Sequence, residues 1–286
     1  MKLNILCIGD IVGRPGRRVL ADKLKELVTA REIDCVIANA ENAAGGSGLT
    51  PQIYNKLLHY GVNLVTLGDH AYRKKQIIET LEKREDIARP ANWSELAAGR
   101  TVAIYKTGKG PTVAAIPLIG RLFMKPAECP YNAIDKLLPK ASSQAEIIFI
   151  DFHAEATSEK VAMGYHLDGR VSCVFGTHTH IPTADEKILP KGTAYITDIG
   201  MTGAHNSVIG RGVESVLKSF RTRMPVPFEV ATEDVKINGI LVTVDSNTKK
   251  AEHIERIRID ADPGTPGDAT RYDSDDGKPE YYNNFE

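Results

Sequence analysis

The chain has 286 residues, and its 36 Lys and Arg nearly balance its 37 Asp and Glu. A formal net charge of −1 excludes a global field that would attract nucleic acid or a membrane surface. The hydrophobic fraction of 42% is ordinary for a soluble globular protein, and no segment approaches the roughly 20 apolar residues of a membrane span.

The cysteines and the N-terminus favour a cytoplasmic protein. The four cysteines are Cys7, Cys35, Cys129 and Cys173. They lack C-x-x-C spacing, and three lie inside apolar runs, where Cys behaves as a small hydrophobe. That usage suits a reducing compartment. The apolar start is interrupted by Asn4 and Asp10 and has no small-residue cleavage site, so we do not interpret it as a signal peptide.

The first third of the chain alternates strand, loop and helix. Apolar runs predict strands over 3–9, 35–40 and 63–67. Gly13, Pro15 and Gly16 break the first strand. An amphipathic helix is then predicted from about 17 to 31, because its apolar residues lie on one side, namely Val19, Leu20, Leu24 and Leu27. A second helix follows Thr50 as N-cap and ends at Gly61. This alternation predicts an α/β protein with parallel strands covered by helices.

The pattern loosens between residues 89 and 139. We expect strands over 101–106 and 112–117, then a surface insertion or lid. Periodicity returns with a strand over 146–151, a helix over 158–167, the V-F-G-T-H-T-H strand and a strand over 193–196. Residues 239–245 and 251–259 alternate about Ser246-Asn247 and predict a β-hairpin. We assign residues 1–260 to one domain and predict a disordered tail over 261–286.

Polar side chains collect where five of the predicted strands end. They are Asp10, Glu41, Asn42, Asp69, His70, His153, His178 and His180. In parallel sheets the carboxyl ends of strands form the ligand site, and residues two apart, such as His178 and His180, can face one point. A mixed carboxylate, amide and imidazole set suits borderline divalent ions such as Mn, Fe, Zn or Co. Eight donors are too many for one tetrahedral ion and about right for two.

Single members of this set have ordinary explanations, since a capping Asp or a buried His is common. The four remaining histidines are assigned to surface or structural roles, and these are His59, His166, His205 and His253. Arg14 and Arg121 are candidate phosphate clamps, although solvated surface arginines explain them equally well.

The polar stretches resemble those of a known group, the calcineurin-like dinuclear metallophosphoesterases, and within it the YmdB-like phosphodiesterase family. The resemblance lies in G-D-I-V-G-R-P-G, A-N-A-E-N-A-A-G-G-S-G, T-L-G-D-H, H-A-E-A-T-S-E-K, L-D-G-R-V, G-T-H-T-H-I-P-T-A-D-E and T-D-I-G-M-T-G. It implies a four-layer α-β-β-α sandwich. It also implies an enzyme that hydrolyses cyclic nucleotides or similar phosphodiesters by attack of a metal-activated water.

The resemblance also implies roles for individual residues. Asp10 and His180 would hold one metal ion, and Glu41 would bridge to the second. The second ion would be held by Asp69, His153 and His178. Asn42 would assist the first metal or the substrate phosphate, and His70 would be the catalytic residue that acts on the leaving group. The cofactors would be two divalent ions, Mn, Fe or Zn.

One position departs from the family pattern. The family has Asn in G-N-H, and this chain has Asp69. Asn offers a neutral carbonyl oxygen, whereas Asp adds a full negative charge. We therefore expect tighter metal binding and a weaker attraction for an anionic substrate.

Two alternatives remain from the sequence. One is a metal-binding regulatory or scaffold protein of the same fold that has lost catalysis, and Asp69 is the feature in its favour. The other is a nucleotide-binding module using G-G-S-G, a loop that lacks the Lys-Ser/Thr of a P-loop. We expect a small phosphodiester as substrate, no membrane partner, and a homo-oligomer, the last resting on the poorly patterned middle segment.

Overall fold

A computed structural model describes residues 1–262 of the protein. The predicted disordered tail therefore lies outside the described residues, apart from its first two positions. Among residues 1–262, no helix combines the length and the apolar character that crossing a membrane requires.

The strands form two sheets. In the first, the order is β2-β12-β13-β1-β3-β4-β5, and β14 pairs with β13. Their bounds are β1 Lys2–Ile8, β2 Asp10–Ile11, β3 Cys35–Asn39, β4 Leu64–Thr66, β5 Ile87–Ala88, β12 Met201–Ala204, β13 Val235–Asp245 and β14 Ala251–Asp260. The predicted parallel pairing of the first strands is confirmed, because β1, β3, β4 and β5 run parallel. The predicted hairpin is also confirmed as β13 and β14.

The second sheet has the order β10-β11-β9-β8-β7-β6. Its strands are β6 Ala103–Lys106, β7 Thr112–Ile119, β8 Ile147–His153, β9 Cys173–Thr177, β10 Lys187–Ile188 and β11 Ala194–Ile196. The inner strands β7, β8, β9 and β11 are parallel, whereas the edge strands β6 and β10 pair antiparallel.

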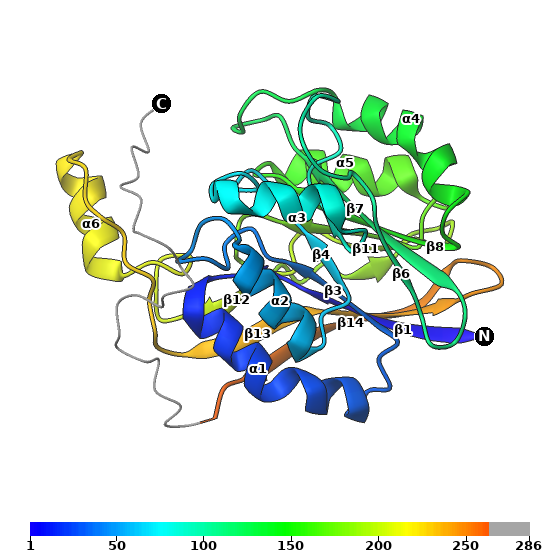
Figure 1. Ribbon diagram of the computed structural model, residues 1–286, viewed down its shortest axis with the longest axis horizontal. Coiled ribbons are helices and arrows are strands. Elements are labelled where there is room, and N and C mark those ends of the chain that lie inside the picture. Colours follow the sequence, from blue (N-terminus) through cyan, green and yellow to red (C-terminus); the bar gives the residue numbers. More distant parts are fainter. Residues whose placement is uncertain (263–286) are drawn as a thin grey trace.

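Helices cover the outer face of each sheet. Their bounds are α1 Gly13–Ala30, α2 Pro51–Tyr60, α3 Ile78–Lys83, α4 Pro130–Ser142, α5 Thr157–Leu167 and α6 Val213–Thr222, with a 3-10 turn Lys75–Ile77 before α3. Figure 1 shows α1 and α2 on one side of the strands, α4 and α5 on the other, and α6 projecting from one end. Three apolar clusters lie between the layers, one under α1 and α2, one between the sheets, and one under α4 and α5. The expected four-layer α-β-β-α sandwich is therefore the observed fold.

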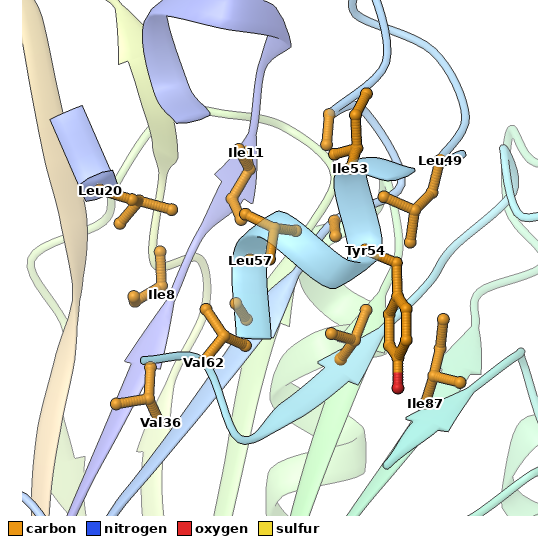
Figure 2. Close-up of a cluster of buried hydrophobic side chains, with 14 of the residues drawn as sticks. Ile8, Ile11, Leu20, Val36, Leu49, Ile53, Tyr54, Leu57, Val62 and Ile87 are labelled. Carbon is orange, nitrogen blue, oxygen red and sulfur yellow. The ribbon is translucent and has the colours of Figure 1, made fainter. Parts of the chain in front are cut away.

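The alternation of side chains along a strand explains these layers. In β1, Leu3, Ile5 and Cys7 point into the space between the sheets, whereas Leu6 and Ile8 face the helices. Figure 2 shows the helical side of this arrangement, where Ile53, Tyr54 and Leu57 of α2 pack over the strands that carry Ile8, Val36 and Ile87. Strands buried on both faces read as continuous apolar runs, which is why the sequence reveals them.

Two helices differ from the sequence-based expectation. Helix α1 begins at Gly13 rather than near residue 17. Pro15 lies in its first turn, where a missing N–H costs nothing, and a Cβ on Gly16 would lie 2.2 Å from the carbonyl oxygen of Thr202. Helix α4 falls in the segment that lacked a clear period, and it contains Pro139, which is unfavourable inside a helix. The segment 89–139 thus contributes two strands and a helix to the second half of the sandwich.

Candidate metal centre

The strand-end residues of both sheets meet at one edge of the sandwich. From the first sheet, Asp10 begins β2, Glu41 and Asn42 follow β3, and Asp69 and His70 follow β4. From the second sheet, His153 ends β8, and His178 and His180 follow β9. The two sheets therefore bring together residues far apart in the sequence, as the hydrogen bond from the His178 N–H to Asp10 Oδ2 (3.2 Å) illustrates across 168 positions.

His153 lies at the centre of the cluster. Its Nε2 is 3.2 Å from Asp69 Oδ1, 3.2 Å from Glu41 Oε1 and 3.0 Å from His178 Nδ1. The side chains of His153 and Asp10 are completely buried, and the Glu41 side chain is 1% exposed. Three overlapping groups could each hold an ion, namely Asp69 with His153 and His178, Asp10 with Glu41 and His153, and Glu41 with Asp69 and His70.

The donor geometry fits divalent metal ions. Two ligand atoms on one tetrahedral ion, each about 2.1 Å from it, lie about 3.4 Å apart, close to the separations around His153 Nε2. His180 Nε2 lies 3.9 Å from Asp10 Oδ1, somewhat wider. Among the described residues, Asp10 Oδ1 is a buried oxygen without a hydrogen-bond partner. A buried carboxylate oxygen without a partner is costly unless a cation neutralises it, so the residues present fit the metal that the donor set implies.

Burial and mutual attraction shift the pKa values in the cluster. Burial raises the pKa of Asp10 to about 6. Burial would also raise the pKa of Glu41 and of Asp69, but the neighbouring imidazoles bring both below their ordinary values. Burial alone would lower the pKa of His153, yet Glu41 and Asp69 raise it well above its ordinary value. Burial and the nearby His153 lower the pKa of His178 to about 4, so this imidazole is neutral and ready to ligate at pH 7.

Polar contacts of the second ring nitrogen orient the three histidines. His153 Nδ1 lies 2.9 Å from Thr177 Oγ1, and the Thr177 hydroxyl donates to Asp151 Oδ1 at 2.6 Å. His178 Nε2 lies 3.2 Å from Glu155 Oε2. His180 Nδ1 donates to the carbonyl oxygen of Ile209 at 3.0 Å. Each ring therefore presents one remaining nitrogen to the cluster, Nε2 of His153 and His180 and Nδ1 of His178, as expected for metal-binding histidines.

Asp151 anchors this arrangement from below. It is completely buried and also accepts hydrogen bonds from Thr66 Oγ1 at 2.5 Å and Asn39 Nδ2 at 3.0 Å. Thr66 and Asn39 belong to the first sheet, whereas Asp151 and Thr177 belong to the second. The carboxylate thus joins the two sheets beneath the cluster, a role that the sequence pattern did not reveal.

His70 and Asn42 form a pair at the rim of the cluster. His70 Nδ1 lies 2.7 Å from Asn42 Oδ1, and the His70 backbone N–H donates to Glu41 Oε2 at 3.0 Å. Asn42 Nδ2 lies 3.3 Å from Glu41 Oε1 and 3.2 Å from His180 Nε2. The His70 side chain is 23% exposed and lines the adjoining pocket, so it can reach a bound molecule.

A pocket of about 240 Å³ adjoins the cluster. Its polar lining is formed by Glu41, Asn42, His70, His178 and His180. Its apolar lining, which we name the apolar wall, is formed by Val208, Ile209, Val216, Phe220 and Phe228. Sequence reasoning missed this wall, because its residues lie in a segment without strand or helix periodicity apart from α6.

The remaining sequence-based candidates lie elsewhere. Arg14 and Arg121 are not among the pocket-lining residues of the described chain, and Arg121 is exposed. No residue of 89–139 lines this pocket within the described range, so a lid from that segment stays a prediction. Among the other histidines, His59 and His253 are exposed, His166 lies beside Asp135, and His205 lies beside Asn238.

The chain is similar to known proteins along most of its length. The YmdB-like protein family matches residues 6–257. A 2',3'-cyclic-nucleotide 2'-phosphodiesterase of Bacillus subtilis (strain 168) is 45% identical over 260 residues, which cover 91% of this chain and 98% of that protein. The crystal structure of a novel phosphatase from Mycoplasma pneumoniae is 35% identical with a TM-score of 0.85, covering 91% of this chain and 94% of that one. A hypothetical protein from Thermus thermophilus is 39% identical with a TM-score of 0.84, covering 90% of this chain and 99% of that one.

Proposed function

The chain belongs to the YmdB-like protein family, and we propose that it hydrolyses nucleoside 2',3'-cyclic phosphates at the cluster around His153. It is a phosphodiester hydrolase of the metallophosphoesterase fold. The observation that carries the choice of site is the meeting of buried carboxylates and imidazoles from both sheets beside a pocket.

We propose two divalent ions for this site. Asp69, His153 and His178 would hold one ion, Asp10 and His180 the other, and Glu41 would contact both. The central position of Glu41, 3.2 Å from His153 Nε2 and in two of the three donor groups, supports the shared role. Bound divalent ions would polarise the phosphoryl group and activate a water for in-line attack. Mixed oxygen and imidazole donors suit Mn, Fe or Zn.

His70 is proposed as the acid that protonates the leaving oxygen. Its Nδ1 lies beside Asn42 Oδ1, and its Nε2, which is 3.8 Å from Asp69 Oδ2, would be the atom that donates to the substrate. Asn42 would therefore serve two purposes, fixing the His70 ring through Oδ1 and placing its Nδ2 beside Glu41 and His180. A positioned acid of this kind contributes roughly 10²–10⁴ in rate.

The test is a screen of the four 2',3'-cyclic nucleotides with Mn-loaded protein, in which metal content is measured for every sample. His70→Ala should lower kcat by roughly 10²–10⁴ and keep its metal, whereas His59→Ala, on the exposed side of α2, should match the unmodified protein. Loss of metal in His70→Ala would make His70 a ligand instead. Two equivalents of metal without turnover in any metal-loaded form would favour a metal-binding scaffold.

A further inference from the structure

The apolar wall contrasts with the polar lining of the same pocket. The polar lining carries carboxylate, amide and imidazole groups suited to metal and phosphate, whereas the wall offers aliphatic side chains and two phenyl rings. Phe220 is 68% exposed, and Phe228 is half-buried. An exposed aromatic ring that borders a polar reaction site is a common contact for a flat apolar group of a ligand.

Backbone pairing fixes the wall in place. The Gly212 N–H donates to Glu229 O, and the Ala231 N–H donates to Gly210 O, each at 2.9 Å. These bonds join the segments that precede and follow α6, so the helix lies at the end of a chain segment whose two sides are paired. Phe228 therefore lies next to the paired backbone, whereas Val216 and Phe220 lie on α6 itself.

The wall is also tied directly to the candidate metal ligands. The carbonyl oxygen of Ile209 accepts the hydrogen bond from His180 Nδ1. The guanidinium of Arg211 donates to the carbonyl oxygens of Gly45 and Gly46, in the loop that follows Glu41 and Asn42, and of Phe228. These links attach the wall to His180 and to the loop that follows Glu41 and Asn42.

The chemistry of the apolar wall indicates which group of a ligand it contacts. Its five side chains carry no charge and no hydrogen-bonding group, and the cation beside them, Arg211, is engaged by backbone carbonyls. A volume of about 240 Å³ lies just below the roughly 300–1,000 Å³ of pockets for drug-sized molecules, so the pocket can take a ligand of about the size of a mononucleotide. Bases of any identity stack on aromatic side chains, because every base has a π-face.

We propose that the apolar wall is the base subsite of this enzyme, with the nucleobase of a nucleoside 2',3'-cyclic phosphate against Phe220 and Phe228 and its phosphate at the polar lining. This inference rests on the proposed function and adds the residues that contact the nucleobase of the substrate. Since the wall offers no polar side chain to read a base edge, the subsite accepts purines and pyrimidines alike.

The experiment compares two substrates that differ only in the base. The first is 2',3'-cyclic AMP, and the second is the base-free methyl riboside 2',3'-cyclic phosphate. The ratio of kcat/KM for the two is measured in the unmodified Mn-loaded protein, in Phe220→Ala and in Phe228→Leu, which keeps apolar volume but removes the ring. Leu217→Ala is the matched control, because Leu217 lies on α6, is 50% exposed and does not line the pocket.

We expect the unmodified protein to prefer the nucleotide, and each Phe variant to lose roughly tenfold of that preference, mainly through KM. Leu217→Ala should keep the ratio. Equal turnover of the two substrates by the unmodified protein, or an unchanged ratio in both Phe variants, would overturn the base subsite while leaving the hydrolase function intact. If no phosphodiester is cleaved, the proposed function fails. The base subsite is then tested by calorimetry, which compares the affinity of 3'-AMP for the unmodified Mn-loaded protein and for Mn-loaded Phe220→Ala. Equal affinities would reject the base subsite.

Discussion

The ammonium group of Lys160 lies 2.7 Å from Asp198 Oδ2, and each side chain is only 1% exposed. The same carboxylate oxygen accepts hydrogen bonds from the backbone N–H and the hydroxyl of Thr179, at 3.2 and 2.7 Å. Thr179 separates His178 and His180, whose φ angles of 95° and 64° lie in the left-handed region that non-glycine residues rarely adopt. The buried ion pair thus holds a strained loop that presents two candidate metal ligands.

Breaking this pair should destabilise the protein. Lys160→Met leaves the Asp198 carboxylate buried without its cation, which costs about 3–5 kcal/mol of unfolding free energy. The double variant Lys160→Met with Asp198→Asn removes the stranded charge and should recover part of that loss. Urea unfolding of both variants measures how much of the unfolding free energy is recovered. Lys83→Met, which breaks the exposed Lys83–Glu79 pair, should unfold like the unmodified protein. A double variant no more stable than Lys160→Met would contradict this account.

Thr177→Val tests the link between His153 and Asp151. The substitution keeps the side-chain shape but removes the hydroxyl that joins His153 Nδ1 to the carboxylate. Metal affinity should fall about 10–100-fold, the usual effect of losing the group that orients a metal-binding His. Thr66→Val is the control, because it removes another hydrogen bond to Asp151 without touching His153. It should lower stability by about 1 kcal/mol and leave metal affinity unchanged. Equal losses of affinity in the two variants would remove the specific role of Thr177.

Much of the fold could be predicted, because periodicity is a local property of the sequence. The apolar run of β1 and the alternation along β13 and β14 revealed the strands and the hairpin, and the polar residues that follow β1, β3 and β4 marked the site edge. The pairing of Lys160 with Asp198 and the presence of Phe220 in the same pocket as His70 depend on tertiary contacts that no local pattern encodes. Helix α4 was missed for a local reason, since Pro139 is unfavourable inside a helix although Ile134, Leu138 and Ala141 keep a helical spacing.

Asp69→Asn tests the departure from the family pattern. Asp69 Oδ1 is 3.2 Å from His153 Nε2, and its side chain is only 16% exposed, so its charge acts at short range. Removing it should weaken metal binding at least about tenfold and strengthen the attraction for an anionic substrate, lowering KM. Metal titration and steady-state kinetics at saturating metal measure the two effects separately. Asp135→Asn, at an exposed carboxylate paired with Arg170, should change neither quantity. Unchanged affinity and turnover in Asp69→Asn would show that the charge has no role.

Metal binding should release protons and weaken as the pH falls. Burial raises the pKa of Asp10 to about 6, and Glu41 and Asp69 raise the pKa of His153 above its ordinary value despite burial. Both groups must be deprotonated to ligate, so protons compete with the metal, most strongly below pH 6. The raised pKa of Asp10 also stabilises the metal-free fold at low pH, and that stability is lost as the pH rises through 6. The difference in Tm between metal-loaded and metal-free protein should therefore widen from pH 5 to pH 7.5. Calorimetry of metal binding in buffers of different ionisation enthalpy counts the released protons. No proton release at pH 7, together with a Tm difference that stays constant with pH, would refute the assignment of His153 and Asp10 as ligands.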